Sequence, residues 1–92
     1  MFYAYVLRSL QTGRLYKGSC GDLGIRLQKH NAGRVRSTKP YGPWELLHSE
    51  PFDTRSEAFR REQHWKSVAG AKELTALLRG KPSGSSLTPS GF

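Results

Sequence analysis

The chain has 92 residues, which is enough for one domain and too few for two. Its 15 Lys and Arg outnumber its 7 Asp and Glu, and the formal net charge of +8 favours a polyanionic partner. No apolar run approaches the roughly 18 residues of a membrane span, and the N-terminus does not fit a signal peptide. The lone Cys20 excludes an internal disulfide. We therefore expect a cytoplasmic protein without a membrane or disulfide partner.

The first half of the chain predicts a β-hairpin followed by a helix. Aromatic and β-branched residues at 2–7 are typical of a strand, a turn follows at 11–13, and 15–18 form the returning strand. Asp22 is a suitable N-cap for a helix that ends near residue 32, where a glycine closes it. The polar segment 34–43 contains two prolines and predicts a loop.

The second half predicts one more strand, at 44–50, and two helices. Thr54 and Glu57 have the spacing of a capping box and begin a helix that ends near residue 67, and the last helix covers 71–79. The order β-β-α-β-α-α predicts a small α+β domain over 1–79, in which helices flank a three-stranded antiparallel sheet. Residues 80–92 are mostly Gly, Pro, Ser and Thr and predict a flexible tail.

Positive charge is concentrated in the first half of the chain. Residues 45–92 hold seven basic and six acidic side chains, whereas residues 1–44 hold eight basic side chains and one acid, Asp22. We interpret the first half as the source of a nucleic-acid-binding face, and the alternative is a solvated surface that keeps a small protein soluble. The residues assigned to nucleic-acid binding are Lys17, Lys29, Arg34, Arg36 and Lys39.

Glu62 stands out because it lies on an apolar helix face. Ala58, Glu62, Trp65 and Ala69 follow helical spacing, so they share one side of the second helix. A carboxylate among core residues is costly unless it is paired or bound to a cation. Glu62 is therefore a functional group, one half of a salt bridge with Arg26 or another basic residue, or a side chain that extends to the rim of the core.

Arg26 and His30 are four residues apart on the first helix, so they project together. A guanidinium donates two parallel hydrogen bonds to a phosphate, and an imidazole changes charge near neutral pH. The pair suits phosphodiester cleavage, and the alternative is two exposed helix residues.

The tyrosines of the predicted hairpin form a second candidate group. Tyr3 and Tyr5 point to one face of the first strand, and Tyr16 lies on the strand beside it. Core packing is one interpretation, and a hydroxyl that orients or deprotonates a water is the other.

Other familiar chemistries find no support in the sequence. His48 and His64 lack a ligand-like spacing to each other or to Cys20, which argues against a zinc site. The glycine-rich segment 18–21 lacks the Gly-Lys-Ser/Thr ending of a phosphate loop, and neither a nucleophile elbow nor carboxylates paired as in glycosidases are present.

Taken in order, the short motifs resemble those of the GIY-YIG nuclease family. Tyr3-Ala4-Tyr5 precedes Tyr16-Lys17-Gly18 by ten residues, as in the paired motif that names the family. Further matches follow at Asp22-Leu23, Arg26-Leu27, His30-Asn31, Gly33, Arg36-Ser37-Thr38-Lys39, Pro43-Trp44-Glu45-Leu46, Ser56-Glu57-Ala58 and Arg61-Glu62. The resemblance covers about residues 2–74. Within the family, the sequence is similar to the small stand-alone members.

This resemblance implies a β-β-α-β-α core and metal-dependent hydrolysis of nucleic-acid phosphodiesters. It implies that Tyr5 and Tyr16 position or activate the attacking water, that Arg26 stabilises the scissile phosphate, and that His30 matches a frequent histidine of the same helix. Glu62 matches the single metal-ligating glutamate, which would hold one Mg²⁺ or Mn²⁺. Gly18 and Asn31 match structural positions of the motifs.

Departures from the family pattern bear on efficiency and specificity. Lys17 stands where an apolar residue is usual, and Gly24 weakens the helix start by roughly 0.5–1 kcal/mol relative to Ala. Without a second DNA-binding domain, we expect a weakly specific monomer that cleaves DNA rather than RNA, either single-stranded or branched, as in DNA repair. The alternatives are a binding module on the same fold that has lost turnover, and a structural basic protein.

Overall fold

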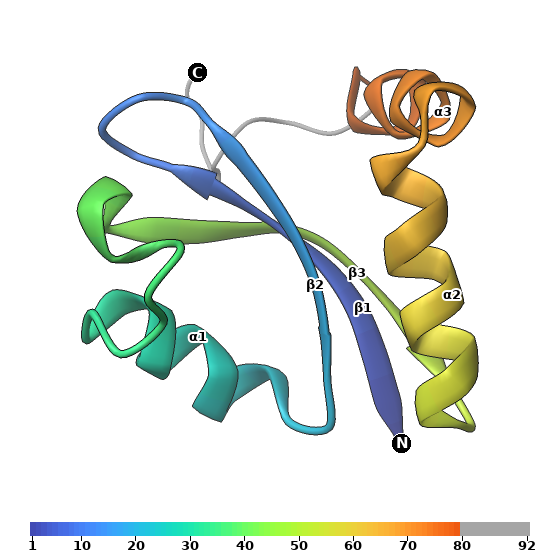
Figure 1. Ribbon diagram of the computed structural model, residues 1–92, viewed down its shortest axis with the longest axis horizontal. Helices are drawn as coiled ribbons and strands as arrows, with labels where there is room; N and C mark the ends of the chain where they lie inside the picture. Colours follow the sequence, from blue (N-terminus) through green and yellow to red (C-terminus); the bar gives the residue numbers. More distant parts are fainter. Residues whose placement is uncertain (80–92) are drawn as a thin grey trace.

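A three-stranded antiparallel sheet forms the centre of the molecule (Figure 1). The computed structural model describes residues 1–79, and the tail predicted at 80–92 lies outside the described residues. The strands are β1 (Phe2–Ser9), β2 (Leu15–Cys20) and β3 (Trp44–Phe52), in the order β2-β1-β3. Strand β1 is therefore central, whereas β2 and β3 are edge strands.

The helices cover both faces of this sheet. Helix α1 (Leu23–Asn31) lies on one side, while α2 (Arg55–Lys66) and α3 (Val68–Arg79) lie on the other (Figure 1). The order β-β-α-β-α-α and the α+β class are confirmed. None of the helices within residues 1–79 has the length and apolar character needed to cross a membrane.

The central strand supplies side chains to two separate cores because its residues alternate between the faces. Ala4 and Val6 pack against Trp65 and Leu74 of α2 and α3, and all four are at most 1% exposed. On the opposite face, the buried residues are Tyr5, Leu7 and Trp44, packed against Tyr16, Leu23, Leu27 and Tyr41. Each fully buried large apolar side chain stabilises the fold by about 1.5–3 kcal/mol.

Capping interactions set where the helices begin. The Asp22 carboxylate accepts a hydrogen bond from the backbone N–H of Ile25 at 2.9 Å, as the sequence predicts. Thr54 and Glu57 form the predicted capping box. These caps satisfy backbone N–H groups that a helix leaves unpaired in its first turn.

The last helix begins three residues earlier than predicted, at Val68 instead of residue 71. Ser67 has an extended backbone that ends α2. Its hydroxyl accepts a hydrogen bond from the N–H of Gly70 at 3.0 Å, so the same serine also caps the start of α3. As a consequence, Ala69 belongs to α3 and is exposed, so its predicted place beside Glu62 is wrong.

The segment predicted as a loop at 34–43 contains a short 3-10 helix, η1 (Lys39–Tyr41). Pro40 lies in its first turn, where a proline's fixed φ and missing N–H fit a helix start. Gly33, with φ of 74°, supplies the left-handed residue that closes α1. The strands also run further than predicted, with β3 ending at Phe52.

Candidate active site

Three buried side chains form a hydrogen-bonded chain from the central strand to the loop after α1. The Tyr5 hydroxyl lies 2.9 Å from Nε2 of His30, and Nδ1 of His30 lies 2.8 Å from the Thr38 hydroxyl. All three residues are at most 2% exposed. The interpretation of Arg26 and His30 as an exposed pair is therefore wrong for His30.

The hydrogen-bond directions along this chain favour one tautomer of the imidazole. The Thr38 hydroxyl donates its proton to the Val35 carbonyl at 3.3 Å, so its oxygen accepts from the Nδ1–H of His30. The other nitrogen, Nε2, is then the acceptor for the Tyr5 O–H. In this tautomer Tyr5 donates its proton to His30, and its oxygen can only accept hydrogen bonds from other groups.

Burial keeps this chain neutral. It raises the pKa of Tyr5 far above its usual value, with the nearby Tyr16 adding to the effect. Burial, followed by the positive charge of Arg26, lowers the pKa of His30 to about 4. Both groups are therefore uncharged at neutral pH.

Gly18 allows the Tyr5 hydroxyl to approach strand β2 closely. A Cβ at position 18 would lie 2.5 Å from that hydroxyl oxygen, closer than real Cβ contacts occur. Tyr16 packs edge-on against His30 with ring centres 5.0 Å apart, and it is half-buried. Within residues 1–79 no hydrogen-bond partner reaches the Tyr16 hydroxyl.

Glu62 lies on the other side of β2, where it is 8% exposed. The Ser19 hydroxyl donates to its Oε1 at 2.8 Å, and Nζ of Lys66 lies 2.6 Å from its Oε2. The carboxylate thus has the paired arrangement that the sequence left open, with Lys66 four residues along the helix as its partner and not Arg26.

Strand β2 brings the two groups of residues to one edge. Gly18 is opposite Tyr5 and Ser19 is opposite Ala4, so adjacent β2 residues face α1 and α2 in turn. In Figure 1, β2 crosses in front of β1 with α1 and α2 on its two sides. The tyrosines and Glu62 therefore lie on opposite faces of the sheet, on the two sides of β2, whose outer edge has no neighbouring strand within residues 1–79.

A polar hollow of about 250 Å³ opens where β2 turns into α1. The residues that line it are Ser19, Cys20, Gly21, Asp22, Ile25, Arg26, Lys29 and Arg55. It therefore joins Arg26 to Ser19, the residue that holds Glu62. Burial raises the pKa of the Cys20 thiol, which has no disulfide partner in the chain.

The basic residues assigned to nucleic-acid binding lie mostly around α1. Lys29 is on the exposed side of α1, Arg34 and Arg36 follow the helix, and Lys39 begins η1 with its side chain against Gly33. Lys17 is separate from them, because it is opposite Val6 and so points toward the face that α2 and α3 cover. None of the five forms a salt bridge with an acid among residues 1–79.

Asn31 connects the end of α1 to the start of β3. Its side chain accepts a hydrogen bond from the N–H of Trp44 at 2.6 Å and donates one to the Trp44 carbonyl at 3.2 Å. This bracket holds α1, and with it Arg26 and His30, against the sheet.

The donor set around Glu62 fits a hard divalent cation bound mainly by water and substrate. No group of three His, Cys, Asp or Glu side chains that could cage a metal exists in the described part of the chain. Mg²⁺ commonly uses one or two carboxylates together with waters and substrate phosphates. Glu62 and the Ser19 hydroxyl are the residues that would hold it.

Sequence reasoning missed Thr38 and Ser19. Thr38 is in a loop segment, where no periodicity indicates which side chain turns inward. Ser19 could have been found from the sequence. Because side chains alternate along β2, Ser19 faces the other side of the sheet from Gly18, toward the helix that carries Glu62.

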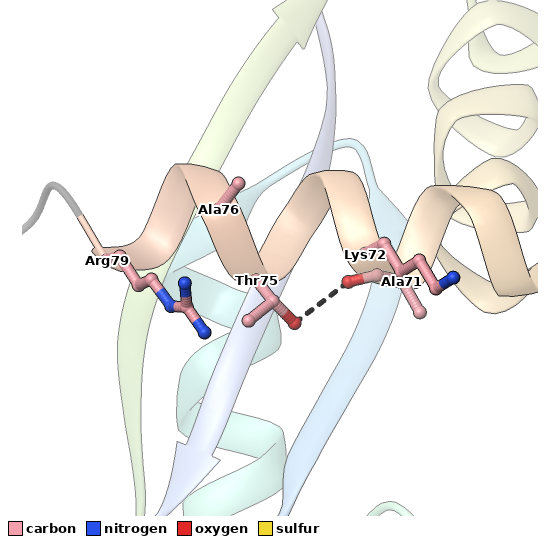
Figure 2. A pocket seen from close by; sticks show the side chains of 5 residues that line it. All are labelled: Ala71, Lys72, Thr75, Ala76 and Arg79. Carbon is pink, nitrogen blue, oxygen red and sulfur yellow. Dashed lines mark hydrogen bonds between the residues drawn. The ribbon is translucent and has the colours of Figure 1, made fainter.

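A second hollow lies away from these residues, on α3 (Figure 2). It measures about 350 Å³ and is lined by Ala71, Lys72, Thr75, Ala76 and Arg79. The Thr75 hydroxyl donates to the Ala71 carbonyl of its own helix at 2.9 Å (Figure 2). Since this hollow contains none of the candidate groups, the site at β2 is the better candidate.

Comparisons with known proteins agree with this arrangement. A family model described as the GIY-YIG catalytic domain matches residues 1–74. A UPF0213 protein from Staphylococcus saprophyticus is 37% identical over 79 residues, which cover 85% of this chain and 95% of that protein. UPF0213 proteins of Staphylococcus aureus, among them that of strain N315, are 34% identical over 76 residues, 82% of this chain and 92% of theirs.

A solved structure is also similar to this chain. The solution NMR structure of a UPF0213 protein from Bacillus halodurans is 31% identical in sequence, covers 90% of each chain and superposes with a TM-score of 0.52. The relatives are small, single-domain proteins of similar length, as the resemblance implied. On the match of residues 1–74, the chain belongs to the GIY-YIG family.

Proposed function

We propose that this protein is a metal-dependent endonuclease that hydrolyses phosphodiester bonds of DNA, preferentially single-stranded or branched, with weak sequence specificity. The observation that carries the proposal is the placement of two sets of groups on the two faces of the sheet beside the edge strand β2. Tyr5, Tyr16 and Arg26 lie on one side of this strand, and Glu62 lies on the other.

The two tyrosines are proposed to orient the attacking water. The Tyr5 oxygen acts only as an acceptor because its proton is donated to His30. It therefore accepts a hydrogen bond from the water and leaves a lone pair of the water oxygen free to attack phosphorus. The half-buried Tyr16 hydroxyl is the second contact.

Arg26 is proposed to bind the scissile phosphate. Its guanidinium lines the hollow beside Ser19 and has no acidic partner among residues 1–79. Phosphate binding would also reduce the positive potential that lowers the pKa of His30. The imidazole then becomes a better proton acceptor when substrate is present.

Glu62 is proposed to hold one Mg²⁺ or Mn²⁺, which when bound would stabilise charge on the leaving oxygen. Ser19 keeps the carboxylate at the strand edge, and Lys66 balances its charge before the cation binds. All of these groups come from a single chain, so we propose that the monomer is active.

A binding module without turnover is the second candidate. The contact between Lys66 and Glu62 favours it, because an ammonium group already satisfies the carboxylate that would bind the cation. In that case Lys29, Arg34, Arg36 and Lys39 bind nucleic acid and no bond is cleaved.

A cleavage panel separates the two candidates. Labelled single-stranded, nicked and branched DNA and single-stranded RNA are incubated with the protein, with Mg²⁺, with Mn²⁺ and with a chelator. Glu62→Gln is compared with Asp53→Asn, which also removes one carboxylate but lies at an exposed position outside the site. The nuclease proposal expects metal-dependent cleavage that Glu62→Gln lowers at least about a hundredfold and Asp53→Asn leaves intact. Binding without cleavage of any substrate supports the module instead.

A further inference from the structure

Helix α2 carries a cation on the same stripe as Glu62. Arg55 precedes Glu62 by seven residues, which is within about 20° of two full turns and about 10 Å along the axis. Arg60 is about 160° away from Glu62 around the helix and points to the opposite side. Only Arg55 of these two arginines is thus directed toward β2 and α1.

Arg55 meets two cations of α1 in the hollow at the β2–α1 turn. Arg26, Lys29 and Arg55 all line this space of about 250 Å³. The only acid in its lining is Asp22, whose Oδ1 accepts the capping N–H of Ile25. Three positive charges from two helices thus lie around one hollow, against the single negative charge of Asp22.

The position of Arg55 is restrained by its packing. Its guanidinium carbon lies 5.4 Å from the centre of the Phe2 ring, within the range of a cation–π contact. Phe2, Ser19 and Arg55 also line a small adjoining hollow of about 30 Å³. The side chain is therefore placed at the rim of the polar hollow and does not extend freely into solvent.

The hollow continues along α1 into a second one. This next space, of about 320 Å³, is lined by Ile25, Gln28, Lys29, Ala32 and Arg34. Both hollows share Lys29 and Ile25, and Ile25 is 53% exposed, which is high for a large apolar residue. Cations spaced along a groove with an exposed apolar contact between them fit the sugar-phosphate backbone of one strand.

We propose that Arg55 and Lys29 bind a second phosphodiester, next to the one at Arg26, so that a single DNA strand runs from Arg55 along α1 to Arg34. The proposal rests on the proposed function for the phosphate at Arg26. It adds a binding site on α2, in the half of the chain whose charge is nearly balanced. It also adds the course of the strand across the β2–α1 turn.

Binding without divalent cations tests the site independently of cleavage. The affinity of a short labelled single-stranded oligonucleotide is measured by fluorescence anisotropy for the unmodified protein, Arg55→Gln and Arg60→Gln. Arg55→Gln is expected to weaken binding about five- to tenfold and to reduce the slope of log affinity against log salt by about 1. Arg60→Gln loses the same charge outside the proposed site. It is expected to change the affinity and the salt slope only slightly, through the lower net charge of the protein.

Cys20 provides a direct footprint, because it lines the hollow and is the only cysteine of the chain. Its modification by a thiol reagent at mildly alkaline pH is expected to slow when the oligonucleotide is bound. In Arg55→Gln this protection is expected to require about five- to tenfold more oligonucleotide.

Neutral methylphosphonate linkages locate the phosphate. One linkage of the oligonucleotide is expected to weaken binding to the unmodified protein and to have no effect on Arg55→Gln. Equal losses for Arg55→Gln and Arg60→Gln, or no sensitive linkage, overturn the proposal while leaving the nuclease proposal intact. Conversely, a protein that shows this binding pattern but never cleaves retains the phosphate site and loses the proposed function.

Discussion

The two faces of the sheet are built from consecutive residues of one strand and yet differ in kind. Toward α2 and α3, Ala4 and Val6 meet Trp65 and Leu74 in an apolar core. Toward α1, Tyr5 leads into a buried chain of polar groups that ends at Thr38. The face toward α2 and α3 is apolar except at its rim, where Glu62 lies, whereas the face toward α1 holds the tyrosines and His30 among its core residues. Substitutions on the two faces should therefore have separable effects.

The largest effect is expected from emptying the apolar face. Trp65→Ala removes a side chain that is 0% exposed and should lower the free energy of unfolding by about 3–5 kcal/mol. Denaturant unfolding measures the loss, with Phe59→Ala, at a site 51% exposed, as the control that stays close to the unmodified protein. Cleavage per folded molecule should fall less than in Tyr5→Phe, because Trp65 contacts no proposed catalytic group directly, and a loss of rate as large as that of Tyr5→Phe would contradict this expectation.

The matching change on the polar face is Tyr5→Phe. It removes the hydroxyl proposed to contact water, so the cleavage rate should fall about 10²–10³-fold, whereas the free energy of unfolding should fall by only about 1 kcal/mol. Single-turnover cleavage and denaturant unfolding of the same preparation test this. Unchanged cleavage would remove Tyr5 from the catalytic group.

Mild acid should weaken the polar face specifically. The pKa of His30 is about 4 in the folded protein against a usual 6.5, so below pH 6.5 the unfolded chain takes up a proton that the folded protein does not. The free energy of unfolding is thus expected to fall as pH decreases from 6.5 toward 4, by up to about 3 kcal/mol. Above pH 6.5, His30 should contribute no pH dependence to it.

The comparison with His30→Gln isolates that component. Burial tends to raise the pKa of Glu50, but hydrogen bonds from Arg61 and His48 outweigh it and lower that pKa from 4.5. The stability contributed by Glu50 is therefore lost only below pH 4.5, which leaves the interval from 6.5 to 4.5 for His30. A parallel pH dependence of the two proteins across that interval would contradict the expectation.

The last effect is expected at Thr38, which acts on the site only through His30. Thr38→Val leaves the buried Nδ1–H of His30 without its acceptor and should cost about 1–3 kcal/mol, whereas Thr38→Ser keeps the hydroxyl and should recover part of the loss. Nitrogen-15 chemical shifts of the imidazole report the tautomer directly. Thr38→Val should lose the pure Nδ1–H form, and an unaltered tautomer would show that Thr38 does not set it.

Local patterns predicted most of the architecture. Alternation, caps and glycines gave the sheet, α1 and α2, because these signals depend on residues close together in the chain. The start of α3 was misplaced because Ser67 ends one helix and caps the next, which neither helical pattern reveals. Helical spacing alone placed Glu62 toward the sheet.

The contacts of the candidate site were harder to predict. The link from His30 to Thr38 and the bracket between Asn31 and Trp44 join an ordered element to a loop or a distant strand. Such contacts depend on how the chain returns in space and leave no periodic trace. The pairing of Glu62 with Lys66 could be predicted from the sequence, since residues four apart on a helix are neighbours.

The pairing of Lys66 with Glu62 also bears on whether folding would depend on the proposed cation. A small domain whose metal ligands repel one another stays unfolded until the ion arrives, as zinc fingers do. Here the ammonium of Lys66 and the hydroxyl of Ser19 already accompany the carboxylate. The domain is therefore expected to fold in a chelating buffer, and a cation at the proposed site would replace the contact of Lys66 with Glu62.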